Sequence, residues 1–235
     1  MNHSISLFET ATGRWWLPDS VGTDIVIQAM RAGEVFEPEI VAVAEKYAEA
    51  GTVILDIGSN FGQMATMFSR LVGPEGTVHA FEADSDVFAL LTRNLDENVC
   101  TNVVRHYGAV WHTPGLSLCY PEPDFKRFGS FGSYGISPHS RSGRMVPSIT
   151  IDSLNIPGRV SFIKVDVQGS DLFAMQGAIK TIKRDSPVII FEYEDQFQQE
   201  FGTSFADYES FIREMEYHVV EMVGGINYVI APGLK

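Results

Sequence analysis

Cysteine, basic residues and long apolar runs are all scarce in this chain. Its 235 residues include two cysteines, Cys100 and Cys119, without a C-x-x-C pair, which argues against a disulfide framework or a zinc site. Lysine and arginine total 17 against 30 acids, and the net charge of −13 would repel nucleic acids and anionic membranes. No segment approaches the length of a membrane span, and the N-terminus lacks a basic start followed by an apolar stretch. We therefore expect a soluble, cytoplasmic protein that binds neither nucleic acid nor membrane.

The sequence also lacks an internal repeat, a G-x-G-x-x-G turn and a Tyr-x-x-x-Lys pair. What it does have is an alternation of strand and helix patterns, which predicts a mostly parallel sheet with helices on both faces. Apolar runs predict strands at 53–57, 77–81, 102–110, 160–167 and 188–193. Helical spacing predicts helices at 25–30, 37–50, 63–71, 85–95, 171–183 and 205–215. The runs 218–223 and 226–230 flank Gly224-Gly225, which predicts an antiparallel hairpin with a two-residue turn.

The segment 53–63, VILDIGSNFGQ, is the most informative part of the chain. A buried strand runs into Asp56, a turn follows with Gly58 and Gly62, and a helix begins; the next strand ends in Glu82. This order of strand, glycine turn, helix, strand and acid is how an α/β sheet holds an adenosine-containing cofactor. Ordinary turn glycines and helix-capping acids would explain each feature alone, but they explain the complete set poorly.

The substitutions in this turn indicate which cofactor is bound. A dinucleotide site needs a second glycine where Asn60 stands, so that the backbone can approach a pyrophosphate. Asp56 would bring negative charge towards that pyrophosphate, whereas it suits the sulfonium and ammonium of S-adenosylmethionine. Glu82 is placed to accept hydrogen bonds from the two ribose hydroxyls. The sequence therefore predicts S-adenosylmethionine as the cofactor.

A second group of polar residues follows the strand at 160–167. The carboxyl ends of parallel strands meet at one crevice, so we expect Asp56, Glu82, Asp166 and Glu192 to lie around it. Lys164 is two residues before Asp166 and therefore points to the same face. A buried lysine is costly without a partner, so Lys164 is expected to contact an acid or a ligand. An internal ion pair and a catalytic lysine are nearly equal alternatives.

The chain at this point resembles the FkbM family of S-adenosylmethionine-dependent methyltransferases. The resemblance covers about residues 33–195 and rests on six ordered motifs: GEVFE (33–37), LDIGSNFG (55–62), FEAD (81–84), TIDSL (150–154), KVDVQGSDL (164–172) and VIIFEYE (188–194). It implies the Rossmann-like class I methyltransferase fold, a seven-stranded sheet with one antiparallel strand. It also implies methyl transfer to a hydroxyl of a sugar or natural product.

The resemblance assigns roles to individual residues. The cofactor-binding set is expected to be Glu37, Asp56, Gly58, Ser59, Asn60, Gly62, Glu82, Ala83, Ala109 and Asp166. Lys164 and Asp166 match a lysine–aspartate motif beside the transferred methyl group. Gln168 and Asp171 stand where many members have glutamate. The first of these departures removes a base or metal ligand, and no metal site is predicted.

The hypothesis is O-methylation of a small molecule or carbohydrate, with Asp166 as the first candidate for the base and Glu192 as the second. Lys164 would stabilise the developing alkoxide. Histidine is in general better suited to proton transfer near neutral pH, which makes His106, His112 and His139 further candidates, but single histidines are more often structural. The alternatives are a nucleotide-dependent oxidoreductase and a non-catalytic cofactor-binding module. A homo-oligomer is left open by the sequence.

We divide the chain into an N-terminal lead-in at 1–35 and one methyltransferase domain at 36–235. Residues 113–148 form an insertion rich in glycine, serine and proline, with short strand patterns at 116–120 and 145–151. Long loops of this kind in compact domains are often functional lids. Its aromatic residues Phe128, Phe131 and Tyr134 are candidates for the wall of an acceptor pocket.

Overall fold

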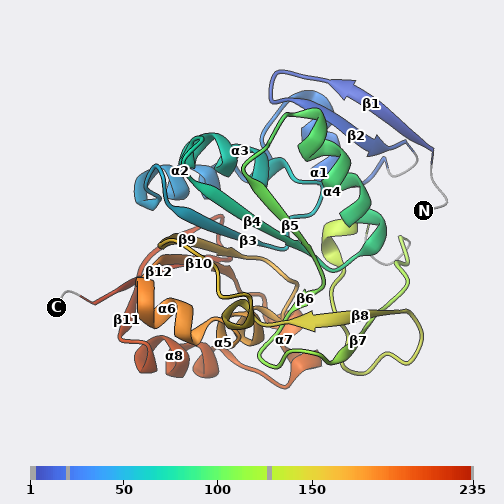
Figure 1. Cartoon of the computed structure of the whole chain (residues 1–235). Coiled ribbons are helices and arrows are strands. Elements are labelled where there is room, and N and C mark those ends of the chain that lie inside the picture. Colours follow the sequence, from blue (N-terminus) through green and yellow to red (C-terminus); the bar gives the residue numbers. More distant parts are fainter. Residues whose placement is uncertain (1–3, 20–21, 126–128, 234–235) are drawn as a thin grey trace.

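A computed structural model describes residues 4–19, 22–125 and 129–233. Within these residues, a seven-stranded sheet has the order β11-β12-β10-β9-β3-β4-β5 (Figure 1). Its strands are β3 (Val53–Ile57), β4 (Thr77–Glu82), β5 (Val103–Tyr107), β9 (Val160–Val165), β10 (Val188–Glu192), β11 (Tyr217–Val223) and β12 (Asn227–Pro232). Neighbouring strands are parallel except at β12, which is antiparallel to both β10 and β11. The predicted mostly parallel sheet with an antiparallel C-terminal hairpin is confirmed.

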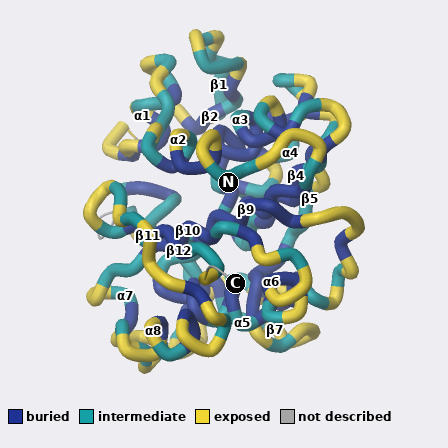
Figure 2. Tube along the Cα trace, turned by 90° about the vertical axis from the view of Figure 1, so that its left-hand side faces the viewer, coloured by how far each residue is buried: buried dark blue, intermediate teal, exposed yellow. Residues whose placement is uncertain are grey.

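Helices cover both faces of this sheet (Figure 1). One face carries α2 (Pro38–Tyr47), α3 (Gln63–Val72) and α4 (Ser85–Glu97), and the other carries α5 (Asp171–Gln176), α6 (Ile179–Asp185) and α8 (Phe205–Glu214). Side chains alternate between the faces of a strand, so Ile54 packs with the first helix layer and Leu55 with the second. The sheet is therefore buried on both sides, as the dark central strands of Figure 2 show. This explains why its strands read as continuous apolar runs.

Two predicted elements are interrupted at glycines. The expected helix at 171–183 is divided into α5 and α6, because Gly177 lies against Trp111: a Cβ at Gly177 would be 2.1 Å from the Trp111 carbonyl oxygen. The expected strand at 102–110 is divided at Gly108 into β5 and β6 (Ala109–Val110). There a Cβ would be 2.8 Å from the Pro147 carbonyl oxygen. In both places a close backbone contact interrupts a regular helix or strand. The apolar periodicity of the sequence does not reveal such a contact.

Two further differences lie in the C-terminal third. The turn between β11 and β12 contains residues 224–226, one more than the predicted two-residue turn. Gly224 and Gly225 both have positive φ, at 60° and 81°. The short helix α7 (Asp195–Phe201) is not predicted by the sequence pattern, because only two of its seven residues, Phe197 and Phe201, are apolar.

The lead-in forms a β-hairpin, β1 (Ile5–Glu9) and β2 (Arg14–Pro18), followed by α1 (Ile25–Ala32). The helix is predicted, whereas the hairpin is not. Trp15 of β2 and Met30 of α1 are fully buried and pack with Phe61 and Leu90. Asn94 of α4 accepts a hydrogen bond from the backbone N–H of Trp16 at 2.6 Å and donates one to its carbonyl at 3.3 Å. The lead-in is thus attached to the outer side of α4.

The insertion forms a second layer beside the carboxyl ends of the main strands (Figure 1). Within its described part, β7 (Ser117–Tyr120) and β8 (Arg144–Ile149) form a three-stranded sheet with β6, in the order β6-β8-β7. A 3₁₀ turn, η1 (Phe131–Ser133), precedes β8, and a second one, η2 (Ile151–Leu154), follows it. Arg144 holds Asp84 at the start of α4 through two hydrogen bonds of 2.7 and 3.0 Å. This bidentate pair fixes β8 next to the end of β4.

Within the described residues, no helix is both long and apolar enough to span a membrane.

Candidate cofactor and catalytic site

The carboxyl ends of four adjacent strands, in the order β10-β9-β3-β4, meet at one edge of the sheet. Each brings one predicted acid: Glu192 ends β10, Asp166 follows β9, Asp56 is next to last in β3 and Glu82 ends β4. The four acids that the sequence predicts around one crevice are therefore brought to the same edge of the sheet.

The turn after β3 is held by close backbone contact. Gly58 has φ +83°, and a Cβ there would lie 1.8 Å from the Asp166 carbonyl oxygen. Gly62 has φ +88° and borders Leu91 of α4. The Ser59 hydroxyl donates to the Asp56 carbonyl at 2.8 Å and accepts from the Phe81 N–H at 3.1 Å. Gly58 is thus required by conformation and by space, and Gly62 by conformation.

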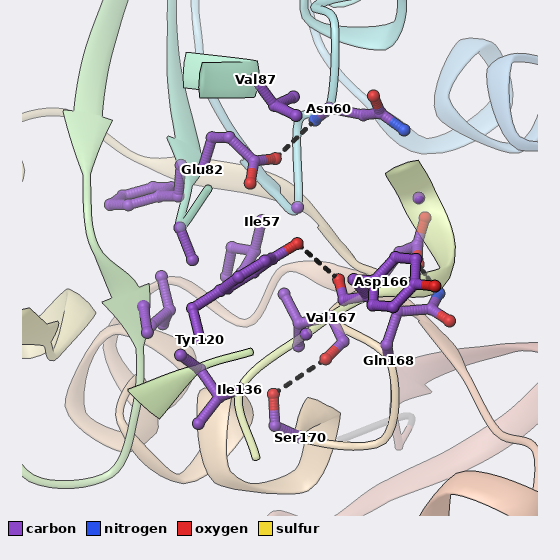
Figure 3. A pocket seen from close by; sticks show the side chains of 18 of the residues that line it. Ile57, Asn60, Glu82, Val87, Tyr120, Ile136, Asp166, Val167, Gln168 and Ser170 are labelled. Atoms are coloured by element: carbon purple, nitrogen blue, oxygen red, sulfur yellow. Dashed lines mark hydrogen bonds between the residues drawn. The ribbon is translucent and has the colours of Figure 1, made fainter. Parts of the chain in front are cut away.

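Glu82 faces this turn from the end of β4. Its carboxylate accepts the backbone N–H of Asn60 at 2.9 Å (Figure 3). It also accepts the backbone N–H of Asp84 at 2.8 Å. Burial raises the pKa of Glu82 to about 7. Asn60 has a positive φ of 48°, and its buried side-chain oxygen has no hydrogen-bond partner within the described chain. A carboxylate and an unsatisfied amide oxygen here suit the hydroxyl groups of a ribose.

Lys164 is enclosed by the two acids on either side of it. Its Nζ is 3.2 Å from Asp166 Oδ2 and 3.6 Å from Asp56 Oδ1, and it donates to the Gly58 carbonyl at 2.9 Å. Burial works against the charged lysine, but Asp166 and Asp56 outweigh it and raise the pKa of Lys164. Asp56 is fully buried, and this burial raises the pKa of its carboxyl. The internal ion pair, one of the two alternatives for Lys164, is present.

Gln168 joins the two candidate bases. Its Nε2 donates to Asp166 Oδ1 and to Glu192 Oε2, both at 3.0 Å. Burial, together with the charges of Asp166 and Asp171, raises the pKa of Glu192 to about 10, so Glu192 holds a proton at neutral pH. Asp171 is fully buried, and burial raises its pKa to about 7. The sequence marks Gln168 only as a departure from glutamate and does not predict that it bridges Asp166 and Glu192.

Two cavities meet at this crevice, and Gly58, Asn60 and Asp166 line both. The first contains about 630 Å³ of empty space, part of it open to solvent, and lies between Glu82 and the insertion (Figure 3). The second contains about 1020 Å³, also partly open, and lies between α1, the turn after β3 and the end of β10. Together they form a continuous site along the carboxyl edge of the sheet.

Most predicted site residues line these cavities. Ala83, Ala109 and Glu82 line the first, and Glu37, Ser59, Lys164 and Glu192 line the second. Gly62 and Asp56 line neither: Gly62 supports the turn, and the Asp56 carboxylate lies beside Lys164. The contact of the Asp56 side chain with a cationic cofactor stays a prediction. None of His106, His112 and His139 lines either cavity; His106 stacks on Phe81 and bonds to His79 at 2.9 Å.

The insertion lines both cavities, and one of its lining residues, Tyr120, is not predicted from the sequence. Phe131 and Tyr134 line the first cavity, whereas Ser130 and Ser133 of the same segment line the second. Tyr120 of β7 is buried in the wall of the first cavity and donates to the Tyr134 carbonyl at 3.0 Å. Its position depends on the pairing of β7 with β8, for which the sequence pattern gives only a weak signal. Phe128 lies outside the described residues.

Comparison with known proteins identifies the family. The sequence model described as the methyltransferase FkbM domain matches residues 56–219, more than half of the chain. The chain belongs to the FkbM methyltransferase family. No curated protein matches it significantly.

Solved structures are similar to this FkbM domain in fold. The methyltransferase FkbM from Methylobacillus flagellatus KT has a TM-score of 0.51 and 14% identity, covering 87% of this chain and 52% of that one. The present chain thus spans about half the length of that protein. The O-methyltransferase TomG from Streptomyces achromogenes, which is involved in tomaymycin synthesis and was solved with S-adenosylmethionine, has a TM-score of 0.54, 14% identity and 92% coverage of both chains. TYW2 from M. jannaschii, also solved with this cofactor, has a TM-score of 0.52, 10% identity and coverages of 98% and 85%. At such low identity the likeness establishes a shared fold.

The class I methyltransferase fold and the cofactor of this FkbM domain, S-adenosylmethionine, agree with the sequence prediction. The residues of the site suit that cofactor. Glu82 and the unsatisfied Asn60 oxygen can bind ribose hydroxyls. Glu37 at the start of α2 offers a carboxylate to an ammonium group, and burial and the charge of Asp166 raise its pKa to about 7. A site with several acids and one paired lysine favours a cationic ligand.

Proposed function

We propose that this FkbM domain is an O-methyltransferase that acts on a hydroxyl of a small molecule or a carbohydrate. The observation that carries the proposal is the position of Asp166, a carboxylate that borders both cavities. The first cavity would hold the adenosine, with Glu82 at the ribose and Tyr120 in the wall. Glu37 and the turn after β3 would hold the methionine part in the second cavity, and the acceptor would occupy the rest.

In this proposal the bound cofactor supplies a methyl group made electrophilic by its sulfonium. Asp166 accepts the proton of the acceptor hydroxyl as that oxygen attacks. Lys164 and Gln168 fix the Asp166 carboxylate at 3.2 and 3.0 Å, so that little reorganisation is needed when the hydroxyl arrives. Glu192 holds a proton at neutral pH because of its raised pKa, which makes it a hydrogen-bond donor to the acceptor and favours Asp166 as the base.

The lead-in and the insertion take part as walls of the acceptor site. Ile25, Val26 and Met30 of α1 line the second cavity on one side, and Ser130 and Ser133 line it near η1. We propose that the lead-in and the insertion select the acceptor and exclude water. Neither segment is part of the core of the domain at 36–235. The insertion at 113–148 acts in this proposal as the lid.

Family membership leaves two of the three initial hypotheses. A nicotinamide-dependent oxidoreductase is not supported, because the chain belongs to a methyltransferase family. A cofactor-binding module without catalysis differs from our proposal in one property, turnover. It would bind S-adenosylhomocysteine but form none from S-adenosylmethionine with any acceptor.

The test is the formation of S-adenosylhomocysteine with a panel of sugars, glycosides and hydroxylated natural products. We expect Asp166→Asn to lower kcat about 100-fold or more, while the affinity for S-adenosylhomocysteine changes by only a few-fold. Asp195→Asn is the matched control, because Asp195 lies outside both cavities and accepts a bond from the exposed Tyr193 hydroxyl.

Three outcomes would count against the proposal. Full activity of the Asp166→Asn variant would remove Asp166 as the base. Absence of S-adenosylhomocysteine binding to the wild type would remove the methyltransferase function. Binding without turnover across the whole panel would favour the non-catalytic module.

A further inference from the structure

The second cavity has an unequal distribution of charge. Four acids line it: Glu37, Asp166, Glu192 and Glu194. Among the described residues that line it, Lys164 is the one basic side chain. Its ammonium is already engaged by Asp166, Asp56 and the Gly58 carbonyl. No described cation of the wall is therefore free to pair with an anionic acceptor.

The remaining walls are apolar or neutral. Apolar side chains of α1, of the segment before α2, of the turn after β3 and of α7 line it: Ile25, Val26, Met30, Phe36, Phe61 and Phe197. Neutral polar side chains also line it, among them Ser130, Ser133, Gln63 and Gln196. These groups can bind a hydroxylated ring on one side and a hydrocarbon face on the other. They add no positive charge.

The acids divide between the cofactor and the acceptor. In the proposed function Glu37 is used by the cofactor ammonium and Asp166 by the reacting hydroxyl. Glu192 and Glu194 remain, two residues apart at the end of β10 and the start of α7. The Glu194 carboxylate accepts a hydrogen bond from the neutral amide of Gln196 at 2.8 Å, and no basic side chain of the described residues forms an ion pair with it.

The pKa values of two of the acids that line the second cavity bear on its negative charge. Burial and then neighbouring carboxylates raise the pKa of Glu37 to about 7 and that of Glu192 to about 10. The part of these shifts that comes from neighbouring carboxylates reflects a negative potential in the cavity, which attracts cations and repels anions.

We propose that the acceptor is a hydroxyl compound with a protonated amine close to the methylated hydroxyl, held by the Glu194 carboxylate, while Glu192 donates a hydrogen bond to the acceptor. Phosphorylated and carboxylated acceptors are excluded by the negative charges of Glu194 and Asp166. This inference rests on the proposed function and adds the substrate class to it: amino sugars and amino alcohols, rather than sugar phosphates, nucleotide sugars or uronic acids.

The experiment uses two sets of matched compounds. The first set shares the glucose ring and consists of methyl glucoside, its 2-amino analogue, the corresponding uronic acid and the sugar 6-phosphate. The second set consists of cyclic amino alcohols and their carboxylate analogues. Binding to the protein loaded with S-adenosylhomocysteine and methylation with S-adenosylmethionine are both measured. We expect the amine members to bind about tenfold or more tightly than their neutral analogues at low salt, with most of this advantage lost in concentrated salt. The anionic members should show no binding.

Two variants connect the preference to the residues named. Glu194→Gln should reduce the amine preference several-fold and leave the affinity for S-adenosylhomocysteine unchanged. Glu209→Gln, an exposed position on α8, should change neither quantity.

The inference is overturned by equal binding of amine and neutral members, by any methylation of an anionic member, or by failure of every amine member to bind the loaded protein. If S-adenosylhomocysteine itself does not bind, the proposed function fails. If it binds and an anionic compound is methylated, the proposed function stands and the substrate class is wrong.

Discussion

Gly58 connects the turn after β3 to the end of β9, because it lies directly against the backbone of Asp166. A side chain on Gly58 would have to displace the backbone carbonyl of Asp166. The side chain of Asp166 is the proposed base. The neighbouring Lys164 also bonds to the Gly58 carbonyl at 2.9 Å. A change at this one residue therefore affects the turn, the lysine and the acid together.

We expect Gly58→Ala to lower the free energy of unfolding by about 3 kcal/mol or more, because it adds a severe clash to an unfavourable φ. Binding of S-adenosylhomocysteine should be lost. Gly51→Ala is the control: Gly51 has a similar φ of +77°, but a Cβ there would meet nothing within 4 Å. It should cost about 1 kcal/mol. Urea unfolding and titration calorimetry measure both effects, and equal losses in the two variants would show that the contact with Asp166 is unimportant.

Single residues differ in how far the sequence could predict their roles. Glu82 and Asp166 could be placed, because they follow apolar runs that end at the same edge of a parallel sheet. The side chain of Asp56 could not, since its burial beside Lys164 depends on the pairing of β3 with β9. Tyr120 depends on the fold of the insertion, where the pattern is weakest.

At the scale of elements, α1 and η1 are joined by one buried side chain. Asp24 Oδ1 accepts the Ile27 N–H at 3.0 Å and caps α1, and Oδ2 accepts the Phe131 N–H at 2.8 Å. Asp24 is fully buried. The two segments that line the second cavity are thus positioned by the same carboxylate, although they are more than 100 residues apart in the chain.

Asp24→Asn separates the two functions of this carboxylate. Asparagine caps a helix as well as aspartate does, but its amide would face the Phe131 N–H, a donor against a donor. We expect a loss of about 1–2 kcal/mol in the free energy of unfolding, with faster hydrogen exchange at 129–133 and unchanged exchange at 25–32. Asp19→Asn, an exposed site that accepts a bond from Ser6, should show neither effect. Unchanged exchange at 129–133 in the Asp24 variant would refute the coupling.

The elements that the sequence predicts well are those whose apolar period is long and regular, such as α4 with Leu91 and Leu95 or the strands β9 and β10. Those it misses are defined by contacts with distant segments. The break at Gly177 is caused by Trp111, and the hairpin of β1 and β2 is stabilised by Asn94. Local periodicity contains no information on such contacts.

At the scale of the whole molecule, the excess of acids and the acid-rich site together predict an unusual dependence of stability on pH. The pKa values of Glu37, Glu82 and Asp171 are raised to about 7 and that of Glu192 to about 10, chiefly by burial. Above about pH 4.5 the unfolded chain has lost protons that the folded site still holds. These groups therefore make the protein less stable as pH rises, up to about 7 for three of them and up to about 10 for Glu192.

We expect the protein without cofactor to be more stable at pH 5.5 than at pH 8.5. Glu192→Gln should be more stable than the wild type at pH 8.5 by about 1–3 kcal/mol and equal to it near pH 4.5, because the amide needs no proton. Urea unfolding across this pH range measures the difference, with Glu209→Gln as a control that should follow the wild type. A variant that is destabilised equally at all pH values would show that Glu192 is ionised in the folded protein.

The pairing of β6 with β8 has a consequence for how the insertion can vary. Ala109 lies opposite Ser148 and Val110 opposite Ile149, so the segment between them leaves and rejoins the scaffold at adjacent points. A segment with adjacent ends can be lengthened, shortened or replaced at little cost in chain closure. This segment also supplies walls of both cavities. Exchange of this segment would thus change those cavity walls while the sheet, the turn after β3 and the strand-end acids stay unchanged.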